Sequence, residues 1–359
     1  MSPDSFSIDV SLNWVILLQS DALHAKKSAG DLSRYMGLLA GGKAPPIEDA
    51  SGPAPSGPVI ILASDDSDPV RNGFSWRAGD GRVEISGESG RGLCNGIYSF
   101  LGALGISWPG DWQGEEKFPA GLAKKSDGSL APVQLAKKSV YKASHFKGEN
   151  PAAAPWRRFL PPGEKEINRI LKNYEAFAAW AARNCYDALI FPLAVFSSNR
   201  EKLALLKQCA GEYGISLEAG GHDLSSLIPR KYFLLHHDCF RMEEGRRKRD
   251  HHFCPTDPLA LKFLAKESEK LFLASPETKV YHLWPDKGAE TSWCSCPSCR
   301  AFSAQEQNLI AVNAAADVLA AVNPEAFITY YEEPGESGIR RGKIHQRKNL
   351  YRLEKLPEY

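Results

Sequence analysis

The segment ISLEAGGHD, residues 215–223, is a short apolar run that ends in Gly-Gly-His-Asp. Its length and composition predict a β-strand. A helical pattern precedes it, with Leu203, Leu206 and Ala210 on one face, and a second helix is expected after Thr256-Asp-Pro258, where a proline suits the first turn. A strand between two helices is the repeating unit of α/β proteins.

The same alternation extends on both sides of this segment. Strands are expected at 139–146, 186–196, 215–223, 279–288 and 326–335. Five successive strands of this kind predict an α/β fold of the (β/α) TIM-barrel type over residues 139–359. A complete barrel needs about 250 residues, and the pattern stops after the fifth or sixth strand, with NLYRLEKL near the end as the sixth candidate. The barrel is therefore expected to be partial: either the chain is cut short or the barrel is closed in an unusual way.

Residues 1–125 have a different pattern and predict a small α+β domain. Apolar strands are expected at 14–19 and 59–64, a hairpin around Gly79-Asp80-Gly81, and helices near 22–39 and 90–105. Residues 126–138 are polar and are expected to link this domain to the barrel.

Charge and hydropathy exclude several classes of partner. The 359 residues have a formal net charge of +1, so the chain has no general attraction for nucleic acid, and it has no run of 18 apolar residues that would predict a membrane span. The N-terminus has acidic residues before a short apolar run and lacks a basic segment, which argues against a secretory signal. We therefore expect a cytoplasmic protein that binds neither nucleic acid nor membrane.

Three of the eight cysteines lie in the segment WCSCPSCR, as Cys294, Cys296 and Cys299. Zinc in structural sites takes four ligands, and Cys254 in HHFCPTDP is the natural fourth, although His251, His252 or His282 could replace it. Four thiolates leave no open position, so the expected zinc is structural, and no organic cofactor is expected. The alternatives are reduced thiols that only pack, an iron–sulfur or redox centre, and a nucleic-acid finger. The cysteine spacing does not match that of iron–sulfur proteins, and the neutral net charge of the chain argues against a nucleic-acid finger.

Acidic residues also follow the expected strands, where the catalytic groups of barrels lie. We expect Asp286, Glu332 and Glu333 to be catalytic and His222, Trp284 and Tyr331 to bind substrate. Paired carboxyl groups beside aromatic rings suit the hydrolysis of glycosidic bonds. Each acid taken singly could instead cap a helix or pair with a nearby cation.

Several segments resemble known families. GRVEISGESGRGLCNGIYSFLGALGISW (81–108) resembles the α+β domain that precedes the barrel in β-N-acetylhexosaminidases and α-glucuronidases. LEAGGHDLSSLIPRKYF, HFCPTDP, WCSCPSCRAF and YYEEPGE resemble a bacterial family of glycoside-hydrolase-like barrels whose domain has no assigned function. A four-cysteine zinc cluster of similar spacing occurs in a barrel β-galactosidase family, which supports Cys254 as the fourth ligand.

The resemblance implies a carbohydrate-active protein, with two departures from the family pattern. One is that the later strands, which hold further sugar-binding residues in these families, are absent from this chain, and the other concerns the residue after Asp286. Hexosaminidases carry an Asp-Glu pair after the fourth strand, and here the pair is Asp286-Lys287. Only Asp286 carries over. The expectation is a glycoside hydrolase that acts on O-glycosidic bonds by carboxylate catalysis, and the alternative is a non-catalytic carbohydrate-binding or inactive truncated barrel.

Overall fold

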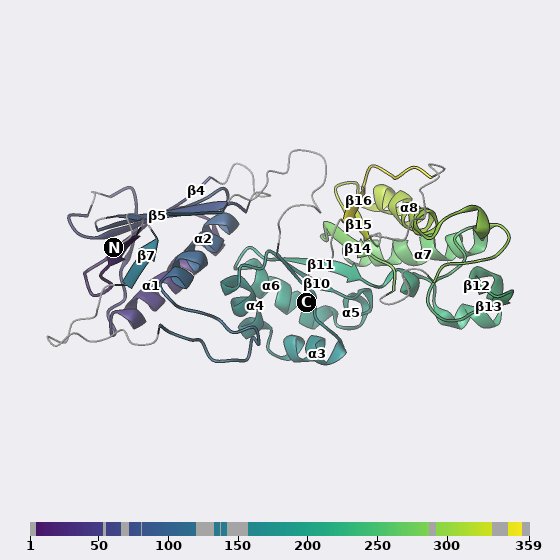
Figure 1. The fold of residues 1–359 in the computed structure, drawn as a ribbon, viewed down its shortest axis with the longest axis horizontal. Coiled ribbons are helices and arrows are strands. Elements are labelled where there is room, and N and C mark those ends of the chain that lie inside the picture. The colour runs from purple at the N-terminus through teal and green to yellow at the C-terminus, as the bar shows by residue number, and fades with distance from the viewer. Residues whose placement is uncertain are drawn as a thin grey trace.

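The computed structural model describes residues 5–52, 55–65, 72–79, 81–119, 133–136, 138–141, 157–286, 292–331 and 344–353. The first half of the chain forms a six-stranded mixed sheet with the order β3-β2-β4-β6-β5-β8. Its strands are β2 (Val15–Gln19), β3 (Ile47–Asp49), β4 (Val59–Ser64), β5 (Phe74–Gly79), β6 (Arg82–Gly87) and β8 (Lys138–Tyr141). Helices α1 (Leu23–Leu39) and α2 (Gly90–Ala103) pack together beside this sheet, and a separate short pair joins β1 (Ser5–Ile8) to β7 (Val133–Ala136) (Figure 1).

The second half forms a parallel sheet of six strands in chain order, as in the first part of a barrel (Figure 1). The strands are β9 (Arg158–Phe159), β10 (Ala188–Phe191), β11 (Ser216–Gly221), β14 (Val280–Leu283), β15 (Phe327–Tyr331) and β16 (Leu350–Leu353). The helices between them are α3 (Glu164–Lys172), α4 (Tyr174–Arg183), α5 (Leu193–Ser198), α6 (Arg200–Gly211), α7 (Pro258–Ala274) and α8 (Ala304–Val322). This confirms the α/β fold with a partial barrel and a preceding sheet domain.

Two of the strand predictions need correction. The strand expected at 139–146 is not part of the barrel: Lys138–Tyr141 is β8, which pairs antiparallel with β5 at the edge of the N-terminal sheet. The first barrel strand is the two-residue β9, which is too short to give a periodic signal in the sequence. The strand expected at 186–196 ends at Phe191, because Pro192 is followed by α5. The expected sixth strand is present as β16, which pairs with β15.

Local signals explain where the helices beside the site begin. Asp257 accepts a hydrogen bond from the backbone N–H of Ala260 and caps α7, with Pro258 in its first turn. Ser303 and Glu306 form a reciprocal capping box at the start of α8. Both helices therefore begin at defined residues, directly after the loops that follow barrel strands β11 and β14.

The junction between β11 and β14 depends on a glycine. Gly220 has φ +116°, and a Cβ atom there would lie 1.9 Å from the carbonyl oxygen of His282 on β14. Only glycine permits this conformation together with this approach of the two strands. The Gly-Gly that precedes His222 therefore sets the close pairing of the two strands whose ends carry the candidate site.

A buried ion pair fixes the N-terminal domain to the barrel half. Arg91 on α2 donates to Asp187 across 3.3 Å, and both side chains are 5% exposed. The guanidinium also donates to the backbone carbonyls of Tyr213 at 3.0 Å and Tyr186 at 2.7 Å, and Asn95 donates to the same carboxylate at 3.0 Å. Because buried charges need such complete pairing, this contact specifies how the two halves dock.

Candidate functional site

Four cysteines form a compact cluster in the loops that follow β11 and β14. Cys254 comes from the loop before α7, and Cys294, Cys296 and Cys299 come from the loop before α8. All four side chains are buried, their sulfur atoms lie within 4.8 Å of one another, and none is in a disulfide. The sequence prediction that these two loops converge is confirmed.

The spacing of the sulfur atoms fits a tetrahedral metal ion. Cys254 Sγ lies 3.7 Å from Cys296 Sγ and 3.6 Å from Cys299 Sγ. Four sulfurs at about 2.3 Å from a tetrahedral zinc ion would lie about 3.8 Å from one another. Disulfide bonds would require about 2.05 Å, so the cluster has the dimensions of a metal site rather than of a pair of disulfides.

Hydrogen bonds within the cluster favour negative charge on Cys254, while they raise the pKa of Cys294 and Cys299, which share their protons with it. Hydrogen bonds from the thiols of Cys294 and Cys299 hold the pKa of Cys254 far below its usual range. The backbone N–H of Met242 donates to Cys294 Sγ at 3.2 Å, and the guanidinium of Arg247 lies 3.8 Å from the same sulfur. Such donors stabilise thiolates, which are the form that binds metal.

A glutamine on α8 holds the loop that carries three of the cysteines. Gln307 accepts a hydrogen bond from the N–H of Cys294 at 3.1 Å and donates to the carbonyl of the same residue at 3.1 Å.

The histidines considered as substitute ligands are not part of the four-cysteine group that the described residues form. His252 stacks on Trp293 with ring centroids 4.2 Å apart, and His282 is bonded to Glu218.

The carboxylate of Asp286 lies after β14 and is held by groups that follow β11. Its Oδ2 accepts a hydrogen bond of 2.6 Å from Ser225, and Arg230 lies 3.9 Å from the same oxygen. Its Oδ1 is buried and has no hydrogen-bond partner among the described residues. His222 points to the same edge, where its Nδ1 donates to the carbonyl of Pro285 at 2.6 Å. The structure therefore brings together Asp286 and His222, two of the predicted site residues.

Asp223 is a second acid at this edge and was not among the predicted site residues. Its carboxylate accepts a hydrogen bond of 2.8 Å from the N–H of Leu193, which follows β10. Burial raises the pKa of Asp223, and the negative charge of Asp286 acts in the same direction. Its place directly after His222 at a strand end is the sequence signal that could have identified it.

The other predicted site residues have different surroundings. Trp284 is completely buried, and its ring is edge-on to His222 with centroids 5.5 Å apart, so it can affect a ligand only through its neighbours. Tyr331, at the end of β15, is partly exposed. Glu332 and Glu333 lie outside the described residues.

A buried polar network lies behind the site. Arg158 on β9 donates to Glu218 on β11 at 2.7 and 3.3 Å, and Glu218 is also bonded to Nε2 of His282 at 2.8 Å. Thr329 on β15 is bonded to Nδ1 of His282 at 2.7 Å and accepts from the indole N–H of Trp284 at 2.9 Å. An ionised carboxylate can only accept, so Nε2 of His282 carries the proton and Nδ1 accepts from Thr329. The network thus joins four of the barrel strands or their ends.

The network makes stability depend on pH. Burial opposes the ionisation of Glu218, but the Arg158 charge and the hydrogen bond from His282 outweigh it and lower the pKa of Glu218 from 4.5 to about 2. Burial lowers the pKa of His282 below 6.5. Both groups bind protons more weakly when folded than when unfolded, so stability is fully present above pH 6.5 and is lost as the pH falls through 6.5 and then 4.5.

Urea unfolding between about pH 7 and pH 3 should show this fall in the free energy of unfolding. A free energy of unfolding that does not change over this range would contradict it.

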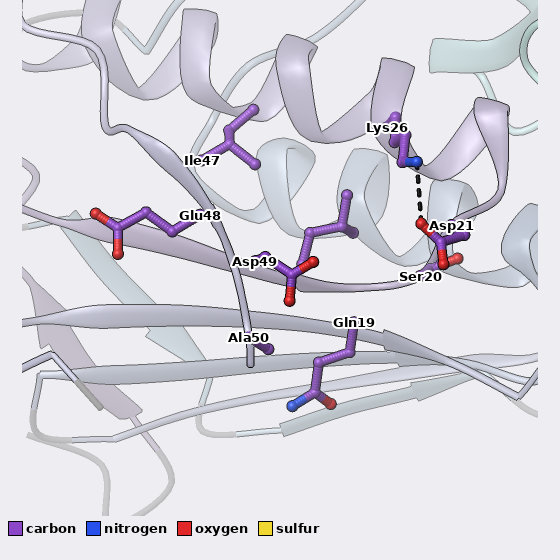
Figure 2. Close-up of a pocket in the computed structure, with 9 residues that line it drawn as sticks. Gln19, Ser20, Asp21, Lys26, Ile47, Glu48, Asp49 and Ala50 are labelled. Carbon is purple, nitrogen blue, oxygen red and sulfur yellow. Dashed lines mark hydrogen bonds and ion pairs between the residues drawn. The ribbon is translucent and has the colours of Figure 1, made fainter. Parts of the chain in front are cut away.

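A separate cavity of about 550 Å³ lies in the N-terminal domain, at the carboxyl ends of β2 and β3. Figure 2 shows its lining, which includes Gln19, Ser20, Asp21, Lys26, Ile47, Glu48, Asp49 and Ala50. Lys26 pairs with Asp21 at 3.1 Å, and Asp49 accepts from the N–H of Ser51 at 2.8 Å. These polar groups are exposed and paired with sequence neighbours, unlike the half-buried groups at the barrel edge.

No family model and no curated protein matches this chain. Solved structures do match its fold. Chitobiase from Flavobacterium johnsoniae aligns with a TM-score of 0.52 at 11% identity, over 91% of this chain and 50% of that one. N-acetyl-β-hexosaminidase from Streptomyces plicatus, solved in complex with Thio-NAglucal, aligns with a TM-score of 0.51 at 12% identity, over 91% of this chain and 62% of that one.

The fold is glycoside-hydrolase-like. This agrees with the resemblance found in the sequence, and the chain spans between about half and three fifths of the length of the enzymes it matches. No helix among the described residues is long and apolar enough to cross a membrane.

Proposed function

We propose that this chain is a carbohydrate-active protein whose site is the barrel edge after β11 and β14, and that it hydrolyses O-glycosidic bonds. The observation that carries the proposal is the setting of Asp286: a carboxylate that accepts a hydrogen bond from Ser225 and lies 3.9 Å from Arg230, at the catalytic end of a glycoside-hydrolase-like fold. The hydrogen bond from Ser225 fixes the orientation of this carboxylate, and Oδ1 keeps unused capacity to accept a hydrogen bond.

Hydrolysis needs two carboxyl groups with opposite tasks. One in its acid form protonates the departing glycosidic oxygen as the C–O bond breaks, and the other, ionised, accepts a proton from the attacking water or stabilises the developing positive charge. Asp286 suits the ionised role because Arg230 lies beside it. The acid is Glu332 or Glu333, as the sequence predicts, or Asp223, whose raised pKa favours the protonated form.

The sugar would contact His222 and Tyr331. Because Nδ1 of His222 donates to Pro285, its ring has a fixed orientation and can present its other nitrogen to a hydroxyl group. Trp284 then acts indirectly, because its ring packs edge-on against the ring of His222 and supports it.

We propose that the four cysteines bind one zinc ion with a structural role. Four sulfur ligands complete a tetrahedral site, so they leave no position for a substrate or a water. The ion would cross-link the loop before α7 to the loop before α8, both of which leave the barrel edge that holds Asp286.

The second candidate is a carbohydrate-binding protein without catalysis. The sequence favours it at one point: the residue after Asp286 is Lys287, where hexosaminidases have a glutamate. Binding without turnover distinguishes this alternative from the first proposal.

The test of the proposal is hydrolysis of a panel of aryl glycosides and glucuronides. We expect turnover by the wild-type chain and a fall of kcat/KM of about 100-fold or more in Asp286→Asn. Asp317→Asn is the matched control, because Asp317 lies on α8 in an exposed pair with Arg347, and it should behave as wild type. Equal rates for the wild type and Asp286→Asn would remove Asp286 from the mechanism, and binding without turnover would favour the alternative.

A further inference from the structure

Arg230 contacts two segments of the chain. Its side chain is 29% exposed and lies 3.9 Å from Oδ2 of Asp286. The same guanidinium donates to the backbone carbonyl of Asp250 at 3.2 Å and to that of His251. A guanidinium with its fixed fork of donors is suited to such a bridge between a carboxylate and two carbonyls, whereas a lysine has a single point of attachment.

The segment that Arg230 contacts is fixed by the cysteine cluster. Cys254 is only three residues beyond His251, and its N–H donates to the carbonyl of Cys239 at 2.8 Å. At the other end, Met242 exchanges hydrogen bonds with the second cysteine loop, donating to Cys294 Sγ at 3.2 Å and accepting from the N–H of Ser295 at 2.8 Å.

Within this segment, the residues that face Arg230 are held tightly. Arg241 is almost completely buried and pairs with Asp250 through two hydrogen bonds of 2.8 Å. His251 has φ +23°, a conformation that a non-glycine residue adopts only when its surroundings impose it. The position of the two carbonyls, and with it that of Arg230, therefore depends on the order of residues 239–254.

We propose that Arg230 is a positioning residue that transmits the state of the cysteine cluster to Asp286. This inference rests on the proposed function, since it concerns the same carboxylate and the same metal site. With metal bound, residues 239–254 hold Arg230 against Asp286, and the guanidinium offsets the negative charge of Asp286 beside Asp223. With the metal removed, the segment loosens, Arg230 is released, and the loop of residues 224–228 loses one of its supports.

Hydrogen exchange measured by mass spectrometry on the full chain tests this link without depending on turnover. The variants are Arg230→Met, Arg230→Lys and the matched control Lys231→Met, which removes an exposed neighbouring cation that lies 5.8 Å from the centre of the Tyr232 ring. Each is measured with zinc added and after treatment with a chelator, over peptides that cover residues 224–228 and 239–254.

In the wild type and in Lys231→Met, chelation should speed exchange in both peptides, by roughly two- to five-fold at residues 224–228, as for the loss of a partly exposed ion pair. In Arg230→Met, residues 224–228 should exchange fast already with zinc present and should no longer respond to chelation, while residues 239–254 still respond. Arg230→Lys should fall between the two, because it keeps the charge and loses the fork.

Two results would overturn the link. One is that chelation speeds exchange at 239–254 but not at 224–228 in the wild type. The other is that Arg230→Met leaves residues 224–228 as protected as in Lys231→Met. If the chain takes up no zinc, the metal proposal and the coupling to it fail together, and the Arg230→Met comparison then decides only whether Arg230 supports Asp286. If no glycoside is hydrolysed but exchange behaves as expected, the link stands and the catalytic proposal fails.

Discussion

Removal of zinc from the four-cysteine cluster should lower the melting temperature of the protein by roughly 5–10 °C. A ligand at about a thousand times its dissociation constant contributes about 4 kcal/mol to stability, and each kcal/mol shifts the melting temperature of a large domain by a few degrees. The reason is structural: the cluster joins two long loops, one running through residues 239–254 and the other before α8.

The measurement combines metal analysis with thermal unfolding. The wild-type chain should contain one zinc ion, and Cys254→Ala should contain none and melt at the temperature of the chelated wild type. Cys209→Ala is the control, because Cys209 lies on α6 outside the cluster and should leave both zinc content and melting temperature nearly unchanged. Protein purified without chelator that contains no zinc, and melts at the same temperature with and without chelator, would contradict the prediction.

Replacement of Glu218 by alanine should cost about 3–5 kcal/mol of unfolding free energy, because it removes a buried carboxylate that pairs with the buried charge of Arg158. Arg158 is 5% exposed and Glu218 is 1% exposed, and both bonds between them would be lost. His282 would also lose the acceptor for its Nε2 proton.

Urea unfolding at neutral pH measures this cost. Asp317→Ala serves as the control, since it breaks an exposed pair with Arg347, and such pairs contribute about 0–1 kcal/mol. The double variant Arg158→Met/Glu218→Leu should recover part of the stability lost in Glu218→Ala, because no unpaired charge remains. A loss below about 1 kcal/mol in Glu218→Ala would show that the network does not stabilise the barrel.

The sequence predicts the cysteine cluster well because its chemistry is local. Three cysteines lie within six residues, and a fourth precedes the intervening helix, so spacing alone identifies the set. The edge that holds His222 and Asp286 is also predicted, since apolar strands and the residues that follow them can be read in order. In both cases the deciding signal lies within one or two short segments.

The polar network and the first strand could not be predicted in the same way. Glu218 is visible as an acid in an apolar run, but its partner Arg158 lies 60 residues earlier in a strand of two residues. Trp284 looks like a sugar-binding ring from the sequence, and its burial depends on Thr329 and His222 from other strands. Partners that are distant in the chain decide these features, and no local pattern records them.

The central claim is that carbohydrate binds at the barrel edge around Asp286, and hydrogen exchange in the presence of sugar tests it most directly. Thioglycoside analogues of the panel that resist hydrolysis would be added to the zinc-loaded chain. We predict saturable slowing of exchange in the peptides that contain residues 222–228 and 284–286. Slowing confined to other regions, such as the cavity lined by Gln19 and Asp49, or no change with any sugar of the panel, would contradict the claim.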